Sequence, residues 1–250
     1  MKMIARFALV AAMAASVALA ASPAAQPPGE AKAEDKTPEV RAVEMIADAY
    51  QLMDIAKEKK LPEVYVGAGR LFLLLDEANK DKKLDPVKSK VEVQTEDGKP
   101  VAGAKTEGKP TRSFAKLADD CFTDARSLAN EQKRGDEINK LIASIKANPL
   151  PVGTREAIGG PKLINQTIGA KQTHTHTIDF NSQKPGAIGF QAAAPLRCKM
   201  AYETYVHFDQ VVRVGSYSWQ PGKDTGAVRR YVITVHNHTN NPVEYKLFTN

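Results

Sequence analysis

Two histidine pairs are the residues of this sequence whose type and spacing best suit metal chemistry. His174 and His176 lie in KQTHTHTIDF, and His236 and His238 lie in TVHNHTN, so four of the five histidines form His-x-His pairs. In a β-strand, residues i and i+2 point to the same face. Neutral imidazoles paired in this way are good ligands for zinc or copper. If the two strands are neighbours, the spacing predicts a four-histidine metal site.

A second interpretation makes the same histidines ordinary strand residues. His176 shares a face with Ile178 and Phe180, which we expect in a core. His238 falls in the turn 237–242, and no carboxylate lies at ligand spacing from either pair. The sequence leaves both interpretations open.

Aromatic residues in the same half of the chain suit a different chemistry. If they are exposed, they could form a platform on which sugars stack. These residues are Tyr205, Phe208, Tyr217 and Trp219. The same segment also contains His207, Asp209, Ser216 and Ser218. A Ser-His-Asp set is recognised by its geometry, and no nucleophile elbow is present, so we expect no enzyme activity.

The first residues are typical of a secretory signal peptide. Lys2 and Arg6 precede an apolar run that extends to Ala20, and Ala18-Leu19-Ala20 suits cleavage after residue 20. The run is short for a membrane anchor, and no later segment is apolar enough to span a membrane. We therefore expect residues 1–20 to be removed, and the mature chain to be soluble and periplasmic or secreted.

The net charge of the chain bears on whether its partner is a nucleic acid. The formal net charge of +6 is mild, and two of the positive charges belong to the predicted signal peptide. A nucleic-acid partner usually requires clustered basic residues, so we expect none. Residues 21–36 are rich in Ala, Pro and charge without apolar periodicity, which predicts a disordered tether.

The two cysteines, Cys121 and Cys198, have two possible roles. Export would permit a disulfide between them. Each also lies on an apolar face of its predicted element, where a free cysteine is commonly buried. The spacing does not decide between a bond and two free thiols.

Apolar residues at helical spacing predict an α-helical domain over residues 37–149. Thr37-Pro38 and Ser113 have the residue types of helix starts, and about four helices fit the pattern. Residues 79–112 interrupt it as a polar insert, which could contain a small hairpin about Asp97-Gly98. Residues 150–161 are predicted to be a linker.

The residue types of 162–250 predict β-strands. The segments 187–193, 199–206, 211–219, 231–237 and 243–248 are rich in Val, Ile, Tyr and Thr and are separated by turn residues. Short strands at regular spacing are typical of an antiparallel β-sandwich. The expected fold class is therefore α+β, with an N-terminal helical bundle followed by a C-terminal sandwich.

The β-rich half resembles the bacterial pre-peptidase C-terminal domain, a small β-sandwich of exported proteins. The resemblance rests on Ser218-Trp219-Gln220-Pro221, on Tyr231 to Asn237, on Tyr245-Lys246-Leu247 and on the Thr249-Asn250 ending, and it covers roughly residues 155–250. It implies that Trp219 is a core or turn anchor. The acidic strand found in many such domains is replaced here by Pro195 to Glu203, which removes support for a calcium role.

These observations predict an exported, non-enzymatic binding or scaffolding protein of the cell envelope. The expected partner is an unknown protein or glycan, and no cofactor is predicted. One alternative is a zinc- or copper-binding protein that uses the histidine pairs. Another is a protein accessory to the hydrolysis of envelope polymers.

Overall fold

The structure is a computed structural model. It describes residues 37–79, 90–101, 113–148, 162–181, 184–220 and 228–250. The described residues form four α-helices and a seven-stranded antiparallel sheet, so the fold is of mixed α+β class. The predicted signal peptide (1–20), the tether (21–36) and the linker (150–161) lie outside the described residues. No described helix is long and apolar enough to cross a membrane.

Capping side chains and first-turn prolines mark where three of the four helices begin. They are α2 (Pro38–Lys59), α3 (Pro62–Ala78), α4 (Phe114–Glu131) and α5 (Gly135–Ala147). The Thr37 and Ser113 side chains cap α2 and α4 by accepting from backbone N–H groups at 3.4 and 3.2 Å. Proline occupies the first turn of α2 and of α3, where its missing N–H costs nothing.

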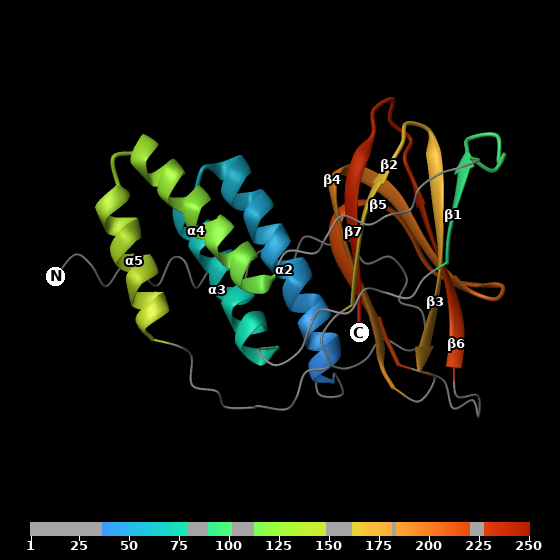
Figure 1. The fold of residues 1–250 in the computed structure, drawn as a ribbon, viewed down its shortest axis with the longest axis horizontal. Helices are drawn as coiled ribbons and strands as arrows, with labels where there is room; N and C mark the ends of the chain where they lie inside the picture. Colours follow the sequence, from blue (N-terminus) through green and yellow to red (C-terminus); the bar gives the residue numbers. More distant parts are fainter. Residues whose placement is uncertain (1–36, 80–89, 102–112, 149–161, 182–183, 221–227) are drawn as a thin grey trace. The chain divides into compact units, whose positions relative to one another are not determined.

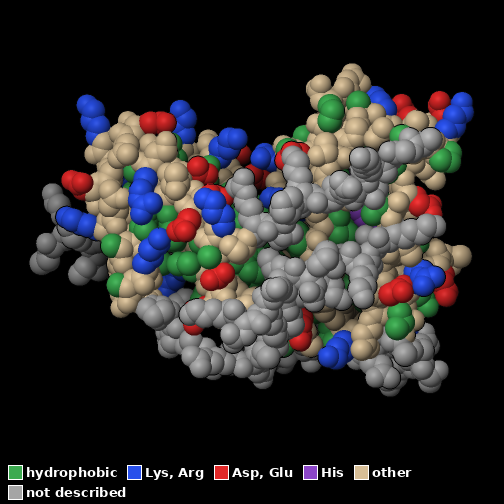
Figure 2. All heavy atoms as spheres, in the orientation of Figure 1, with side chains coloured by type: hydrophobic (Ala, Val, Ile, Leu, Met, Phe, Trp, Pro, Cys, Tyr) green, Lys and Arg blue, Asp and Glu red, His purple; other side chains and the backbone are tan. Residues whose placement is uncertain are grey.

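The helices pack closely around their own core. Gly69 of α3 lies against Phe122 of α4, and a Cβ at residue 69 would come 2.6 Å from the ring. Arg134 forms ion pairs with Glu63 and Glu137, which ties α3 to the start of α5. Figure 2 shows positive and negative side chains interspersed over the described surface on this side of the chain.

Strand β4 (Gly186–Tyr202) organises the sheet because it changes partner along its length. Its first half pairs with β7 (Val243–Thr249), and its second half pairs with β6 (Val228–His236). On its other edge, β4 pairs with β5 (Tyr205–Trp219), and the register shifts between Gln191 and Leu196. Both long strands bend along their length (Figure 1). The result is one antiparallel sheet that curls upon itself, which agrees with the predicted antiparallel β-structure and shows the predicted sandwich only in part.

Strand β1 (Lys90–Thr95) lies between α3 and α4 in the chain, so the expected order of helices followed by strands is found only in part. It belongs to the predicted polar insert, yet it pairs with β3 (Gln172–Asn181) at one end of the sheet. A tight turn follows it, in which the Gly98 N–H donates to the Thr95 carbonyl at 2.9 Å and Gly98 has a φ of 74°. The strand order is β1-β3-β6-β4-β7-β2, with β2 (Lys162–Ile168) at the other end.

Two hydrophobic clusters result from this arrangement. One fills the inner face of the curled sheet and includes the side chains of Met200, Tyr231 and Leu247. The other fills the helical bundle and also takes in Ala187 and Phe248 from the outer face of the sheet.

Helix α2 supplies the contacts between the helices and the sheet. The ring of Tyr50 stacks on Phe248 with centroids 5.9 Å apart, and Lys246 donates to the Tyr50 hydroxyl at 2.9 Å. Helix α2 thus covers the outer face of β4 and β5, and its Tyr50 also reaches Phe248 of β7.

Candidate functional site

The four aromatic residues singled out in the sequence lie together in the structure. With His207 they form a connected set on β5, here named the β5 cluster: Tyr205, His207, Phe208, Tyr217 and Trp219. The His207 ring lies 4.8 Å from Tyr205, 5.9 Å from Tyr217 and 6.0 Å from Trp219, measured between ring centroids. Phe208 joins through Tyr217 at 5.4 Å.

Pairing with β4 sets the direction of these side chains. Phe208 lies opposite Met200, and Tyr217 lies opposite Ile188. Both partners belong to the inner hydrophobic cluster, and opposed residues of an antiparallel pair share a face. The rings therefore project from the inner face of the sheet.

His207 reaches the same face through a β-bulge. Val206 pairs with Ala201 and Phe208 pairs with Met200, which leaves His207 as an extra residue on β5. A bulge turns a side chain away from the simple alternation of a strand, and bulges are frequent beside functional sites. Here the bulge brings the imidazole among the tyrosine rings.

The β5 cluster has a buried base and an open top. Trp219 is 4% exposed and contacts Phe180 and Tyr231, each with centroids 5.0 Å away. Tyr205 is 44% exposed, whereas Phe208 and Tyr217 are partly buried. Trp219 is thus the anchor of the cluster, and the other rings are the part that a ligand can reach.

Two glycines shape this face in opposite ways. A Cβ at Gly186 would collide with the Trp219 indole, so glycine makes room for the anchor. Gly215 lies opposite Phe190 on the inner face, and a Cβ there would meet no atom within 4 Å. Open space therefore adjoins the strand between Phe208 and Tyr217.

The imidazole of His207 is neutral at neutral pH, and the guanidinium of Arg229 lies nearby. Burial, with a smaller effect from Arg229, lowers the pKa of His207 below its usual value of 6.5. The His207 Nδ1 lies 3.5 Å from the Tyr217 hydroxyl. The guanidinium of Arg229 lies over the ring of Tyr202, 5.3 Å from its centroid.

The first histidine pair lies in the interior of the curled sheet. His174 Nδ1 and His176 Nε2 lie 2.8 and 2.6 Å from the hydroxyl oxygen of Tyr245 on β7. Burial lowers the pKa of His174 to about 4 and that of His176 to about 3, and it raises the pKa of Tyr245. All three groups are neutral, and the phenol donates to one imidazole and accepts from the other.

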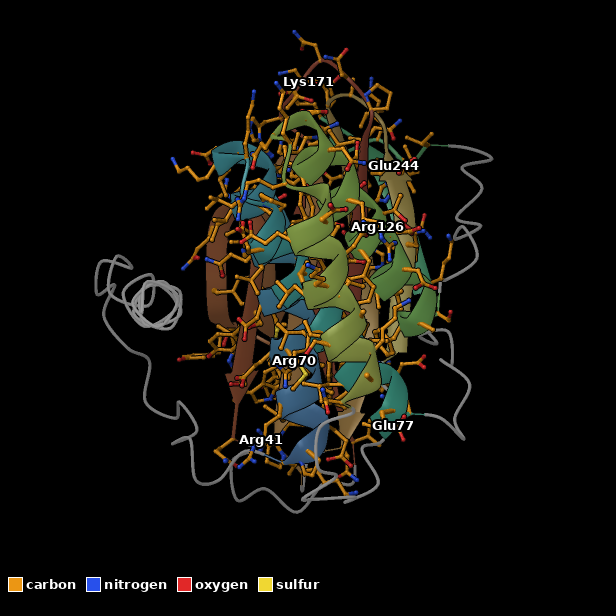
Figure 3. All side chains as sticks on the ribbon, turned by 90° about the vertical axis from the view of Figure 1, so that its left-hand side faces the viewer. Arg41, Arg70, Glu77, Arg126, Lys171 and Glu244 are labelled. Carbon is orange, nitrogen blue, oxygen red and sulfur yellow. The ribbon has the colours of Figure 1, made fainter. Side chains whose placement is uncertain are left out.

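The second pair lies elsewhere, so the structure does not bring the four histidines together. His236 is on the outer face of β6, where its Nδ1 is 3.0 Å from the hydroxyl of Thr173. His238 is exposed in a turn, and its carbonyl accepts from Lys171, labelled in Figure 3, at 2.9 Å. The predicted metal site therefore loses two of its four ligands.

The geometry of the inner pair also suits a hydrogen-bonded network better than a metal. The ring centroids of His174 and His176 are 6.4 Å apart. Two imidazoles that shared a tetrahedral zinc at its usual bond length would lie about 5 Å apart. The hydroxyl oxygen of Tyr245 lies between them instead. No group of three His, Cys, Asp or Glu residues capable of holding a metal occurs among the described residues.

The two cysteines of the possible disulfide are not bonded in the structure. Cys121 and Cys198 are both free and fully buried. Cys121 belongs to the helical cluster and Cys198 to the interior of the sheet, so the two thiols are held in separate cores. Burial raises the pKa of each thiol to about 12.

Two of the hydroxyl and carboxylate groups near His207, those of Ser218 and Asp209, are bonded to other residues. Ser218 lies on the outer face of β5 and donates to Glu44 of α2 at 2.9 Å. Asp209 is held by Arg197 through two hydrogen bonds of 2.7 and 2.8 Å. The sequence analysis considered His207 only as a member of a Ser-His-Asp set. Its place in the aromatic cluster depends on a bulge, which no residue type in this segment signals.

Comparisons with known proteins assign no family. No family model and no curated protein matches the chain. Among solved structures, the chain is similar to a de novo designed double-stranded β-helix at 13% identity. The match covers 36% of this chain and 99% of that one, with a TM-score of 0.25, which is too low to support an argument about fold or function. The resemblance to the pre-peptidase C-terminal domain stays a prediction.

Proposed function

We propose that this is an exported, non-enzymatic binding or scaffolding protein of the cell envelope. Its sheet presents the β5 cluster to a protein or glycan partner. The observation that carries the proposal is the convergence of Tyr205, Phe208 and Tyr217 around His207 on one partly exposed face. Tyrosine combines a large apolar ring with a polar hydroxyl, which is why it is enriched at binding surfaces.

The base of the cluster supports the same proposal. Trp219 is packed against Phe180 and Tyr231, each with ring centroids 5.0 Å away. Rings held in this way lose little conformational freedom when a partner docks, so less of the interaction free energy is spent on ordering them.

The rival functions have less support from the described residues. A metal-binding function would use His174 and His176, but the Tyr245 hydroxyl bridges them and their ring separation is too large. A hydrolytic role needs a nucleophile in contact with a base, and the nearest hydrogen-bonding neighbour of the His207 ring is the Tyr217 hydroxyl.

Co-sedimentation with isolated bacterial envelopes tests the proposal. The fraction of protein that pellets is measured for the wild type, for Tyr205→Ala and for Leu61→Ala. Leu61 is 37% exposed near the start of α3, far along the chain from β5, and serves as the matched control. Loss of one contact ring should weaken binding by about tenfold.

The control variant should bind as the wild type does. Equal binding by wild type and Tyr205→Ala, or no binding by any of the three proteins, would contradict the proposed function.

A further inference from the structure

Resting on the proposed function, we infer that the partner bound at the β5 cluster is an uncharged carbohydrate chain. The inference names the chemical class of the ligand, which the arguments above leave as protein or glycan. It rests on the side chains along the inner face of β5, on the open space at Gly215 and on the edge of the strand.

The side chains of this face alternate between ring surfaces and uncharged hydrogen-bonding groups. Tyr205, Phe208 and Tyr217 supply rings, His207 supplies a neutral imidazole, and Gln210 supplies an exposed amide on the same face. A pyranose has the matching pattern, with an apolar C–H face bordered by hydroxyl groups. Binding sites of this kind combine aromatic surface with a few well-placed polar groups.

Gly215 provides the close approach that a stacked sugar needs. A glycine inside a strand lacks a side chain to pack and often marks a place where a ligand approaches the backbone. Gly215 has no atom within 4 Å of its Cβ position, whereas Gly69, Gly186 and Gly189 each adjoin a ring that fills that position. At Gly69, Gly186 and Gly189 a neighbouring ring explains why a larger residue would not fit. No described residue gives such a reason at Gly215.

The edge of β5 argues against a peptide that adds as a further strand. Strand addition needs a straight edge with free main-chain groups. The bulge at His207 interrupts the ladder, and the register shifts again between Val212 and Val214. Asp209 and Arg213 place charges along the remaining edge, and bulges and charges are the usual protection against strand addition.

The charges beside this face favour a neutral ligand over an acidic or basic one. Asp209 points away from this face, between Phe208 and Gln210, and is bonded to Arg197, while Arg213 is bonded at 2.7 Å to Asp54 of α2. The guanidinium of Arg229 lies over the Tyr202 ring. These charged groups already have partners within the protein. The groups left to bind a ligand are the aromatic rings, the His207 imidazole and the Gln210 amide.

Calorimetric titration with neutral oligosaccharides tests the inference. The probes are cellohexaose, chitohexaose, maltohexaose and xylohexaose, each titrated into wild type, Gly215→Val and Gly67→Ala. Gly215 has no positive φ, so valine should be accommodated in the strand while it fills the space beside the rings. Gly67 of α3 also faces open space and is the matched control.

We expect at least one probe to bind the wild type and the control equally and to bind Gly215→Val at least tenfold more weakly. Thermal unfolding should show Gly215→Val folded at the titration temperature. As a second variant on the exposed side, Tyr205→Ala should lose affinity for the same probe.

A parallel arm separates the inference from the proposed function. Envelopes oxidised with periodate lose sugar diols, and envelopes treated with protease lose protein. Wild-type binding that survives periodate but not protease, together with no binding of any hexasaccharide, would overturn the carbohydrate assignment while the binding function stands. If binding to untreated envelopes is absent or is unaffected by Tyr205→Ala, both proposals fail.

Discussion

Acid should destabilise this protein through the two buried histidines of β3. In the folded chain, the pKa of His174 is about 4 and that of His176 is about 3, against 6.5 for an unperturbed imidazole. The folded pKa lies below the unfolded one, so the unfolded state takes up more protons as the pH falls. Stability should therefore be constant above about pH 6.5 and should fall below it, until the histidines of the folded state also protonate near pH 4 to 3.

The size of the effect follows from linkage. At pH 5 an unfolded histidine is almost fully protonated, whereas both folded histidines are still neutral. Each then lowers the free energy of unfolding by about 2 kcal/mol relative to pH 7.5, or about 4 kcal/mol for the pair. Domains are typically stable by roughly 5–15 kcal/mol, so the loss would be large.

Urea titrations at pH 7.5 and pH 5.0 measure this loss. Trp219 is the only tryptophan and is buried inside the sheet, so its fluorescence reports unfolding of the relevant core. The double variant His174→Gln/His176→Gln should lose about 4 kcal/mol less between the two pH values than the wild type. His238→Gln, which changes an exposed histidine, should keep the full dependence.

Subtracting the loss of stability in the variant from the loss in the wild type removes the contribution that the carboxylates make to both. If the double variant does not fold, the single variant His174→Gln should lose about half of the extra pH dependence. Equal pH dependence in wild type and variant would refute the reasoning, because it would mean that the two imidazoles titrate alike in the folded and unfolded states.

Three further predictions test the packing. Tyr245→Phe removes the hydroxyl shared by two buried imidazoles and should cost about 2–4 kcal/mol in urea titrations at pH 7.5, and a cost below about 1 kcal/mol would mean that the hydroxyl is not shared. Gly69→Ala should lower stability by about 1–3 kcal/mol because its Cβ would press on Phe122, and an unchanged melting temperature would contradict the tight helix contact. Cys121 and Cys198 should not react with a thiol reagent in the folded protein, but two thiols should react in denaturant without reductant. A count of zero in denaturant would indicate a disulfide.

Local signals in the sequence located the helices well. Thr37 and Ser113 cap helices where their side chains predict, and the apolar spacing after each gives the buried face. These features depend on residues within a few positions of one another, which is why the sequence alone was sufficient.

The long strands were harder to predict. The residue types predict two strands, 187–193 and 199–206, separated by turn residues. The structure has one strand from Gly186 to Tyr202, because Pro195 falls at the irregular stretch where β4 changes partner. The turn that follows is made by Glu203 at a φ of 52°, a residue type that does not signal a turn.

At the candidate site too, the sequence predicted how residues of one strand are arranged but not which distant strand they contact. The two-residue period correctly placed His174 and His176 on one face. It did not reveal Tyr245 as their partner, because β7 reaches them only through the curl of the sheet. Strand β1 also escaped prediction as part of the sheet, since its pairing with β3 joins residues about eighty positions apart.

Amide hydrogen exchange of the protein, free and bound to solubilised envelope fragments, tests the central claim most directly. The account predicts that protection on binding is greatest in peptides covering Tyr205 to Trp219, with little change in α4 and α5. Protection confined to the helices, with β5 unchanged, would contradict the assignment of the β5 cluster as the binding surface.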